Sequence, residues 1–182
     1  MSDPPPSPAS DWCERFLATP ADTAALGARL AATAPWSGGA GLGLHLHGSL
    51  GAGKTSLAQG LLRALGVVGA IPSPTYTLVE PYDTARGRLL HVDLYRLRDA
   101  SELEELGLRD EWPEAALRLV EWPERGGALL PEADLDVSLA WDEDADGTGV
   151  AGPGRLARLH ARSGRGRRWL EDFRGYRETD AR

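Results

Sequence analysis

The chain has 182 residues, 42% of them hydrophobic, and a formal net charge of −7. This length and composition favour a single folded domain and exclude a highly charged, disordered chain. The overall acidity argues against a dedicated nucleic-acid-binding protein, because such proteins need positive charge against the phosphates.

The first ten residues, 1–10, are rich in Pro and Ser and predict a disordered tail. They lack the charged-then-apolar pattern of a signal peptide, and the sequence has no apolar run of transmembrane length. The single cysteine, Cys13, leaves no disulfide partner within the chain. We therefore expect a cytoplasmic protein that contacts no membrane.

The next residues predict a strand, a helix and then a strand–loop–helix unit. Residues 15–17 favour a short strand, and residues 23–34 carry apolar side chains at helical spacing. Leucines alternate along residues 41–47, as in a strand. After a glycine-rich turn, a stripe of leucines along residues 54–65 predicts a second helix.

Further strands are expected at residues 75–79, 89–93, 117–122 and 135–139. Ser101 and Glu104 have the form of a capping box at the start of a helix. Strands that alternate with helices predict an α/β fold, here a single domain with a mainly parallel sheet flanked by helices. Ligands of such sheets bind beyond the carboxyl ends of the strands.

This domain is expected to span residues 11–141. Residues 142–154 are acidic and glycine-rich, and they predict a linker or a long hairpin loop. Residues 155–182 carry nine arginines and four acidic residues, and they predict an extension made of a strand and a helix. The basic charge of this extension marks either a solvated helical face or a contact with RNA or an acidic partner.

Residues 48–55, GSLGAGKT, match the pattern G-x-x-x-x-G-K-[ST] between a predicted strand and a predicted helix. Glycines permit a tight turn that directs backbone N–H groups at phosphate oxygens, and the start of the helix adds a favourable dipole. Lys54 would reach the terminal phosphates, and the Thr55 hydroxyl would bind Mg²⁺. The motif predicts a P-loop that binds ATP through Ser49, Leu50, Gly51, Ala52, Gly53, Lys54, Thr55 and Ser56.

Lys54 is the only lysine in the chain, which has 19 arginines. A compact ammonium suits the phosphate position better than a planar guanidinium does. The guanine-specific pattern N-K-x-D needs another lysine, which argues against a Ras-like GTPase. A small-molecule P-loop kinase stays open as an alternative. Such a kinase normally needs a lid with several arginines, and the only dense arginine cluster of this sequence is in the C-terminal extension.

Two predicted strands end in carboxylates suited to Mg²⁺ or to catalysis. Residues 89–93 end at Asp93, as Walker B segments do, and Glu121 follows the apolar residues 117–120. Either carboxylate can bind the metal or orient an attacking water. Thr75 has the position of a hydroxyl that senses the γ-phosphate, and the alternative for it is an ordinary proline turn.

Three aromatic side chains near these motifs have less specific interpretations. His47 and His91 are expected to be packed or paired near the sheet rather than to bind a metal. Trp122 is expected in the core, or stacked on a base or a partner.

Four motifs, in this order, resemble the TsaE family, bacterial ATPases of tRNA threonylcarbamoyladenosine biosynthesis. They are residues 48–55, SPTYTLVE at residues 73–80, HVDLYR at residues 91–96 and LVEWPE at residues 119–124. The resemblance runs from about residue 19 to residue 141. It is specific, since unrelated P-loop proteins share only the first motif.

The resemblance implies an ATPase that supports a TsaB–TsaD pair, which transfers threonylcarbamoyl to the tRNA adenosine beside the anticodon. The tRNA would be met indirectly, through that assembly. The resemblance assigns phosphate binding to Lys54, Mg²⁺ binding to Thr55 and Glu121, metal binding or catalysis to Asp93, and the switch to Thr75.

The resemblance also places Thr19 and Thr23 near the adenine and makes Arg155 and Arg158 candidate nucleotide contacts. The sequence shows no convincing arginine beside the P-loop, and Arg96 is the nearest candidate, so we expect slow hydrolysis by the chain alone and stimulation by partners. Two hypotheses stay open: an ATPase acting in the tRNA-modification assembly, and a nucleotide-gated binding module in which occupancy matters more than turnover.

Overall fold

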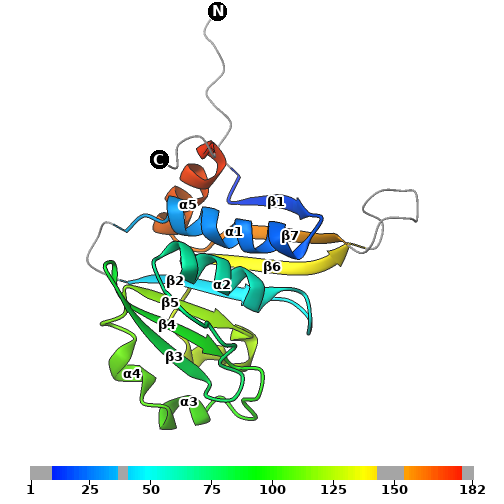
Figure 1. Ribbon diagram of the computed structural model, residues 1–182. Coiled ribbons are helices and arrows are strands. Elements are labelled where there is room, and N and C mark those ends of the chain that lie inside the picture. The colour runs from blue at the N-terminus through cyan, green and yellow to red at the C-terminus, as the bar shows by residue number, and fades with distance from the viewer. Residues whose placement is uncertain (1–9, 37–40, 143–153, 178–182) are drawn as a thin grey trace, which may run out of the picture.

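The computed structural model describes residues 10–36, 41–142 and 154–177 (Figure 1). The expected N-terminal tail, apart from Ser10, lies outside the described residues. The same holds for residues 143–153, which make up almost all of the expected acidic loop.

A seven-stranded sheet runs through the molecule in the order β1-β7-β6-β2-β5-β4-β3 (Figure 1). The four central strands β2, β4, β5 and β6 correspond to stretches of alternating or continuous apolar residues. The strands are β1 (Trp12–Leu17), β2 (Leu42–His47), β3 (Val79–Thr84), β4 (Gly87–Asp93), β5 (Leu117–Glu121), β6 (Leu135–Asp142) and β7 (Gly154–Ala161).

The prediction of a mainly parallel sheet is wrong, because the sheet is mixed. Neighbours are parallel across β6, β2, β5 and β4, whereas β1–β7, β7–β6 and β4–β3 are antiparallel. Strands β3 and β4 are joined by only two residues, Ala85 and Arg86, and so short a connection permits antiparallel pairing alone. The prediction of a strand at residues 75–79 misplaced β3 and so missed this hairpin.

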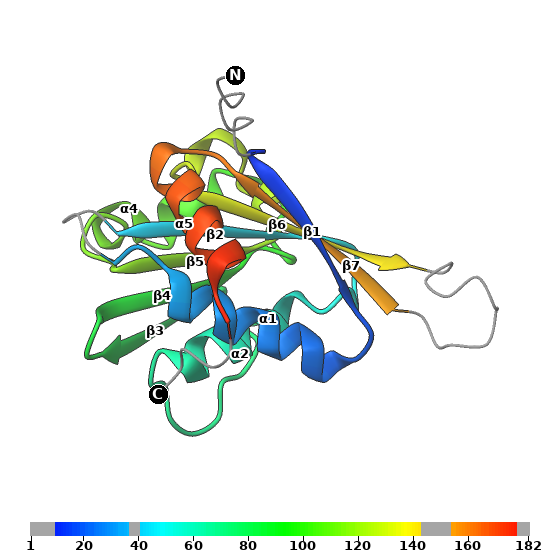
Figure 2. The same ribbon diagram turned by 90° about the horizontal axis from the view of Figure 1, so that it is seen from above.

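Helices cover both faces of the sheet. On one face α1 (Pro20–Thr33) and α2 (Lys54–Ala64) lie side by side, and α5 (Gly164–Gly175) lies next to α1 (Figures 1 and 2). On the other face are the short helices α3 (Glu102–Glu105) and α4 (Leu108–Glu111). Two 3-10 turns, η1 (Pro123–Arg125) and η2 (Gly127–Leu129), follow β5.

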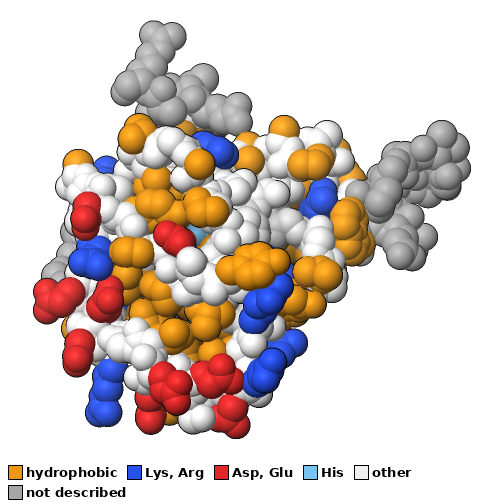
Figure 3. Space-filling view, turned by 60° about the horizontal axis from the view of Figure 1, so that its bottom comes forward, with side chains coloured by type: hydrophobic (Ala, Val, Ile, Leu, Met, Phe, Trp, Pro, Cys, Tyr) orange, Lys and Arg blue, Asp and Glu red, His pale blue; other side chains and the backbone are white. Residues whose placement is uncertain are grey.

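The core is divided by the sheet into two hydrophobic clusters. Leu89 of β4 and Leu119 of β5 pack with α1 and α2, while Leu90 and Val120 of the same strands pack with α3 and α4. This division follows from the alternation of side chains along a strand. Figure 3 shows the face that α3 and α4 help to form, with acidic side chains along its lower and left edges and hydrophobic ones in the middle.

A capping box starts α1 but not α3. The Thr19 hydroxyl accepts a hydrogen bond from the Asp22 backbone N–H, and the Asp22 carboxylate accepts one from the Thr19 N–H. The predicted box at Ser101 and Glu104 is wrong, because Ser101 is already helical and its side chain donates to Asp99. The carboxylate of Glu102 instead accepts the Asp99 N–H, two residues earlier than expected.

The arginine-rich C-terminal segment is part of the same sheet and core. Strand β7 lies between β1 and β6, and α5 buries Trp169 and Phe173 completely. The indole N–H of Trp169 donates to the Leu30 carbonyl of α1 at 3.0 Å. None of the helices in the described part of the chain combines the length and apolar character needed to cross a membrane.

Candidate functional site

A cavity of about 330 Å³ lies at the edge where β2, β5 and β4 end. Carboxyl ends of parallel strands meet at one edge, so the residues that follow these strands are brought together. Asp93 and Glu121 are register partners at the ends of β4 and β5. The cavity is lined by Leu50, Gly51, Gly53, Lys54, Thr55, Ser56, Ser73, Thr75, Asp93, Tyr95, Glu121 and Trp122.

The loop between β2 and α2, residues 48–53 (the glycine-rich loop), needs glycine at two positions. Gly53 has φ +108°, a left-handed conformation that side chains disfavour, and it is the first residue before α2. A Cβ atom at Gly48, where φ is +139°, would lie 2.4 Å from the Leu139 carbonyl oxygen. The loop therefore turns tightly against β6 and leads directly into the start of α2.

Lys54 points back into this loop. Its ammonium donates to the carbonyls of Gly48 at 2.6 Å and Ser49 at 2.9 Å, and it lies 3.7 Å from the centroid of the Trp122 ring. Burial lowers the pKa of Lys54, and the nearby carboxylates, first of all Glu121, oppose this shift. The side chain is a cation held inside the loop, surrounded by oxygen acceptors.

Glu121 is a buried carboxylate held from two sides. Its Oε2 accepts from the Thr55 hydroxyl at 2.9 Å, and its Oε1 lies 2.8 Å from His91 Nε2. Both Glu121 and His91 are almost completely buried. The expectation that His91 is paired near the sheet is confirmed, and its partner is the carboxylate of the cavity.

Asp93 is held by two hydroxyls that come from another segment. Its Oδ2 accepts from Thr75 at 2.6 Å and from Ser73 at 3.1 Å, and its Oδ1 accepts the Tyr95 N–H at 2.9 Å. The Ser73 and Thr75 hydroxyl oxygens also lie within hydrogen-bond distance of each other, at 2.6 Å. The predicted strand at residues 75–79 is wrong, since residues 74–77 form turns that direct these hydroxyls at the cavity.

Trp122 has an unusual backbone. Its φ of +59° and ψ of +46° are left-handed, which is rare for a bulky side chain. This conformation places the indole ring against Lys54 and beside Tyr95, with ring centroids 5.1 Å apart. Such strain concentrates at functional sites, where the surrounding structure compensates for it.

The remaining expected nucleotide contacts lie around the cavity rather than in its lining. Thr19 caps α1, and the buried Thr23 lies beside Gly53. Arg155 donates through Nε to the Ala52 carbonyl at 2.9 Å, which joins β7 to the glycine-rich loop. Arg158 instead pairs with Glu14 of β1 at 2.5 Å.

Arg96 is also outside the cavity lining, and its guanidinium lies 4.1 Å from the centroid of the exposed Tyr76 ring. No arginine is among the described residues that line the cavity. The Glu121–His91 contact and the role of Ser73 were not predicted individually. The sequence does show a hydroxyl at Ser73, two residues before Thr75, and a histidine at His91, two residues before Asp93. These two positions were the signals that could have indicated the contacts.

Residues 17–148 match a family model described as Threonylcarbamoyl adenosine biosynthesis protein TsaE. The chain is 48% identical over 102 residues to the tRNA threonylcarbamoyladenosine biosynthesis protein TsaE of Haemophilus influenzae, covering 56% of this chain and 65% of that protein. It is 40% identical over 133 residues to the protein of the same description from a Nostoc species, covering 71% and 78%.

The fold is similar to that of Bacillus subtilis YdiB in its crystal structure, with a TM-score of 0.68 and 24% sequence identity. The similarity covers 90% of this chain and 95% of the YdiB chain, so it includes most of the sheet and its helices. Because the family model matches well over half of the residues, the chain belongs to the TsaE family of threonylcarbamoyl adenosine biosynthesis proteins.

Proposed function

We propose that this protein binds ATP with Mg²⁺ at the glycine-rich loop and hydrolyses it in support of a TsaB–TsaD pair that modifies tRNA. The observation that carries this proposal is the set of side chains around the loop. A lysine, a threonine hydroxyl and two carboxylates from separate strand ends share one cavity.

The loop fits a phosphate chain. Gly48 and Gly53 allow the tight turn, and the first turn of α2 has free backbone N–H groups, as every helix start has. The Lys54 ammonium reaches the Gly48 and Ser49 carbonyls, and a small rotation would redirect the same donors to phosphate oxygens. These are features of a P-loop.

The oxygen atoms beside the loop fit Mg²⁺. Hard cations prefer carboxylate and hydroxyl oxygens, which Thr55, Glu121 and Asp93 supply. When bound, Mg²⁺ would neutralise the negative charge of the phosphate oxygens during phosphoryl transfer. His91 would keep the Glu121 carboxylate in place, because it holds one oxygen and leaves the other to Thr55 and the cavity.

The described cavity lining contains no arginine, and phosphoryl transfer gains roughly 10³ to 10⁵ in rate from an arginine aimed at the transferred group. We infer that the isolated chain hydrolyses ATP slowly and that the TsaB–TsaD pair raises the rate. The tRNA would be met through that assembly, in the cytoplasm.

A nucleotide-gated binding module is the second candidate, and the segment of residues 73–77 favours it. Ser73 and Thr75 bond to Asp93 in the cavity, while the neighbouring Tyr76 is 81% exposed. A change at Asp93 would therefore alter a surface that a partner can contact.

The assignment is tested by Lys54→Ala, with Arg63→Ala as the control, since Arg63 is an exposed residue of the same helix. We expect Lys54→Ala to weaken the binding of a fluorescent ATP analogue with Mg²⁺ by at least about tenfold, because one charge-assisted contact to phosphate is lost. Arg63→Ala should bind like the unmodified protein. Equal nucleotide affinity in all three folded proteins would refute the proposed function.

A further inference from the structure

A second cluster of polar side chains lies on the other face of the sheet, the one that α1 and α2 do not cover. His45 and His47 are two residues apart on β2, so their side chains share one face. Asp136 of β6 is the register partner of His45 in the parallel pair, and it points to the same face. The three side chains lie next to a cavity of about 800 Å³ that is separate from the cavity at the glycine-rich loop.

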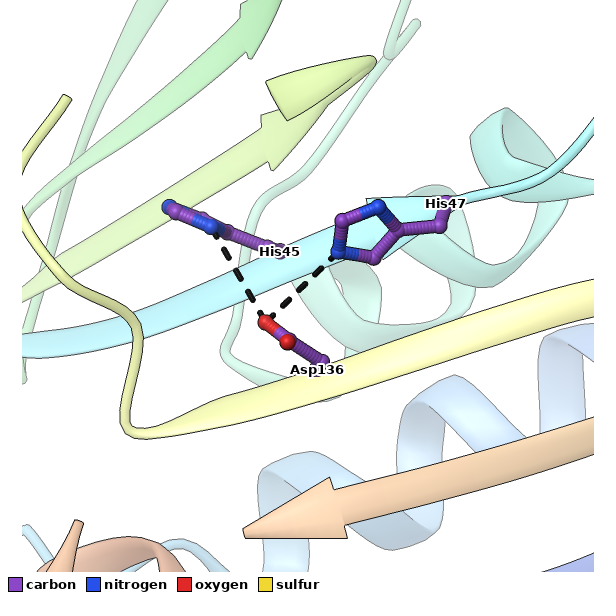
Figure 4. A group of neighbouring side chains, drawn as sticks. All are labelled: His45, His47 and Asp136. Carbon is purple, nitrogen blue, oxygen red and sulfur yellow. Dashed lines mark ion pairs between the residues drawn. The ribbon is translucent and has the colours of Figure 1, made fainter. Parts of the chain in front are cut away.

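The ligand atoms of this cluster converge (Figure 4). His45 Nδ1 lies 3.9 Å and His47 Nε2 lies 3.6 Å from the same oxygen, Asp136 Oδ1. All three ligand atoms lie within 4.8 Å of one another. Ligand atoms around tetrahedral Zn²⁺ are about 3.3 Å apart, as bond lengths of about 2.0–2.1 Å require, so side-chain shifts of less than about 1 Å would close the site.

His45 and Asp136 have the protonation states that a cation needs. Burial lowers the pKa of His45 to about 4, so its imidazole is neutral at pH 7. Burial alone would raise the pKa of Asp136, but its interactions with His47, and to a smaller extent His45 and Arg162, hold that pKa below its ordinary value. His45 therefore offers a nitrogen lone pair and Asp136 a carboxylate, and both lie beside His47 Nε2.

His47 Nε2 is buried and has no hydrogen-bond partner in the described structure, since 3.6 Å to Asp136 exceeds hydrogen-bond distance. Buried polar atoms are rarely left unpaired, and an unmatched one requires an explanation such as an ion. The other nitrogen of the same ring, Nδ1, lies 3.6 Å from the carboxylate of Glu124.

Two outer contacts orient the ligand atoms. Ligating histidines usually direct their second ring nitrogen at a carboxylate or carbonyl, and the Glu124 carboxylate lies on the Nδ1 side of His47, at an ion-pair distance that is too long for a hydrogen bond. Arg162 Nε lies 3.4 Å from Asp136 Oδ2, which leaves Oδ1 facing the two imidazoles. These contacts select the nitrogen and the oxygen that face the centre of the cluster.

We propose that His45, His47 and Asp136 bind a first-row divalent cation, with Zn²⁺ the preferred ion. Two imidazoles and one carboxylate suit Zn²⁺ rather than Mg²⁺, and the adjoining cavity leaves room for a water as fourth ligand. The ion would join β2 to β6 immediately before Gly48, on the face of the sheet that α2 does not cover. This proposal does not depend on ATP binding.

The site is tested on the full chain without a polyhistidine tag, by competition for Zn²⁺ with a chromophoric chelator and by the visible spectrum of the Co²⁺ form. We expect one Zn²⁺ to bind per chain and the visible spectrum of the Co²⁺ form to indicate nitrogen ligands. Zn²⁺ should also raise the midpoint temperature of thermal unfolding. His45→Ala, His47→Ala and Asp136→Asn should each weaken Zn²⁺ binding by at least about tenfold.

Cys13→Ser and Lys54→Ala are controls and should bind Zn²⁺ like the unmodified protein, since neither residue is in the cluster. His160→Ala tests the ligand set, because His160 is the register partner of Asp136 on β7 but is not in the cluster. Asp136→Asn keeps the side-chain shape, so a folded variant is available even where an alanine variant unfolds. Absence of stoichiometric Zn²⁺ binding, full binding by folded Asp136→Asn, or an equal loss in His160→Ala would overturn the proposal.

Discussion

Glu121 joins α2 to β4 at the candidate site through one side chain. It is almost fully buried, yet its two oxygens reach Thr55 on α2 and His91 on β4. A buried carboxylate is costly unless it is hydrogen-bonded, and both of its bonds are present. The residue is therefore held rigidly at the position where the proposed Mg²⁺ would need an oxygen.

We expect Glu121→Gln and Asp93→Asn to reduce ATP hydrolysis by at least about tenfold and to change ATP affinity less. The proposed phosphate contacts come mainly from backbone donors and Lys54, whereas these carboxylates act through Mg²⁺ or water. Single-turnover hydrolysis and equilibrium binding, measured on the same preparations, separate the two effects.

Glu104→Gln is a suitable control, because Glu104 is an exposed carboxylate on α3, away from the cavity lining. If Glu121→Gln and Asp93→Asn hydrolysed ATP as fast as this control, both residues would be structural strand ends.

At the scale of elements, α5 belongs to the core although it follows the region that the family model matches. The match ends at residue 148, whereas Trp169 and Phe173 of α5 are completely buried against α1. Trp169 also donates to the Leu30 carbonyl, so its side chain joins two helices by packing and by a hydrogen bond. Among the basic residues of α5, Arg167 and Arg168 are exposed, whereas Arg165 and Arg174 are partly buried.

Trp169→Ala should therefore lower the free energy of unfolding by about 3–5 kcal/mol, the usual cost of removing a large buried aromatic side chain. Chemical denaturation measures this change directly. Arg168→Ala, which changes the exposed neighbouring position, should shift the free energy by less than about 0.5 kcal/mol. Similar losses in both variants would show that α5 contributes little to the core.

At the scale of the whole molecule, exposed apolar side chains lie beside the candidate site. Leu50 of the glycine-rich loop is 70% exposed and Tyr76 is 81% exposed. Leu50 lines the cavity, and Tyr76 follows Thr75, which also lines it. A partner that covered Leu50 and Tyr76 would therefore also contact the segment that bonds to Asp93. This arrangement suits coupling between nucleotide occupancy and partner binding.

We expect an ATP analogue to tighten association with the TsaB–TsaD pair by at least about tenfold, or about 1.4 kcal/mol, relative to ADP or no nucleotide. The pair should tighten ATP binding by the same factor, because coupling between two binding equilibria is reciprocal. Thr75→Ala should reduce this coupling and spare nucleotide binding by the isolated chain. Equal partner affinities in the three nucleotide states would contradict the gating.

The sequence alone determined the local structure around the glycine-rich loop. The glycine-rich loop, the strand before it and the helix after it follow from residues within about 25 positions of one another, and so does their order. Asp93 and Glu121 were each expected at the end of an apolar strand, and the structure pairs these two strands in parallel.

Only the tertiary structure decided which distant segments pair. The pairing of β7 with β1 and the register that puts Asp136 beside His45 are contacts between residues 91 or more positions apart. His47 was expected to be packed or paired, and its unmatched nitrogen became visible only with its neighbours in place. The periodicity of apolar residues shows which face of a strand is buried. Strand order and register depend instead on how all the elements of the chain pack together, which no single segment specifies.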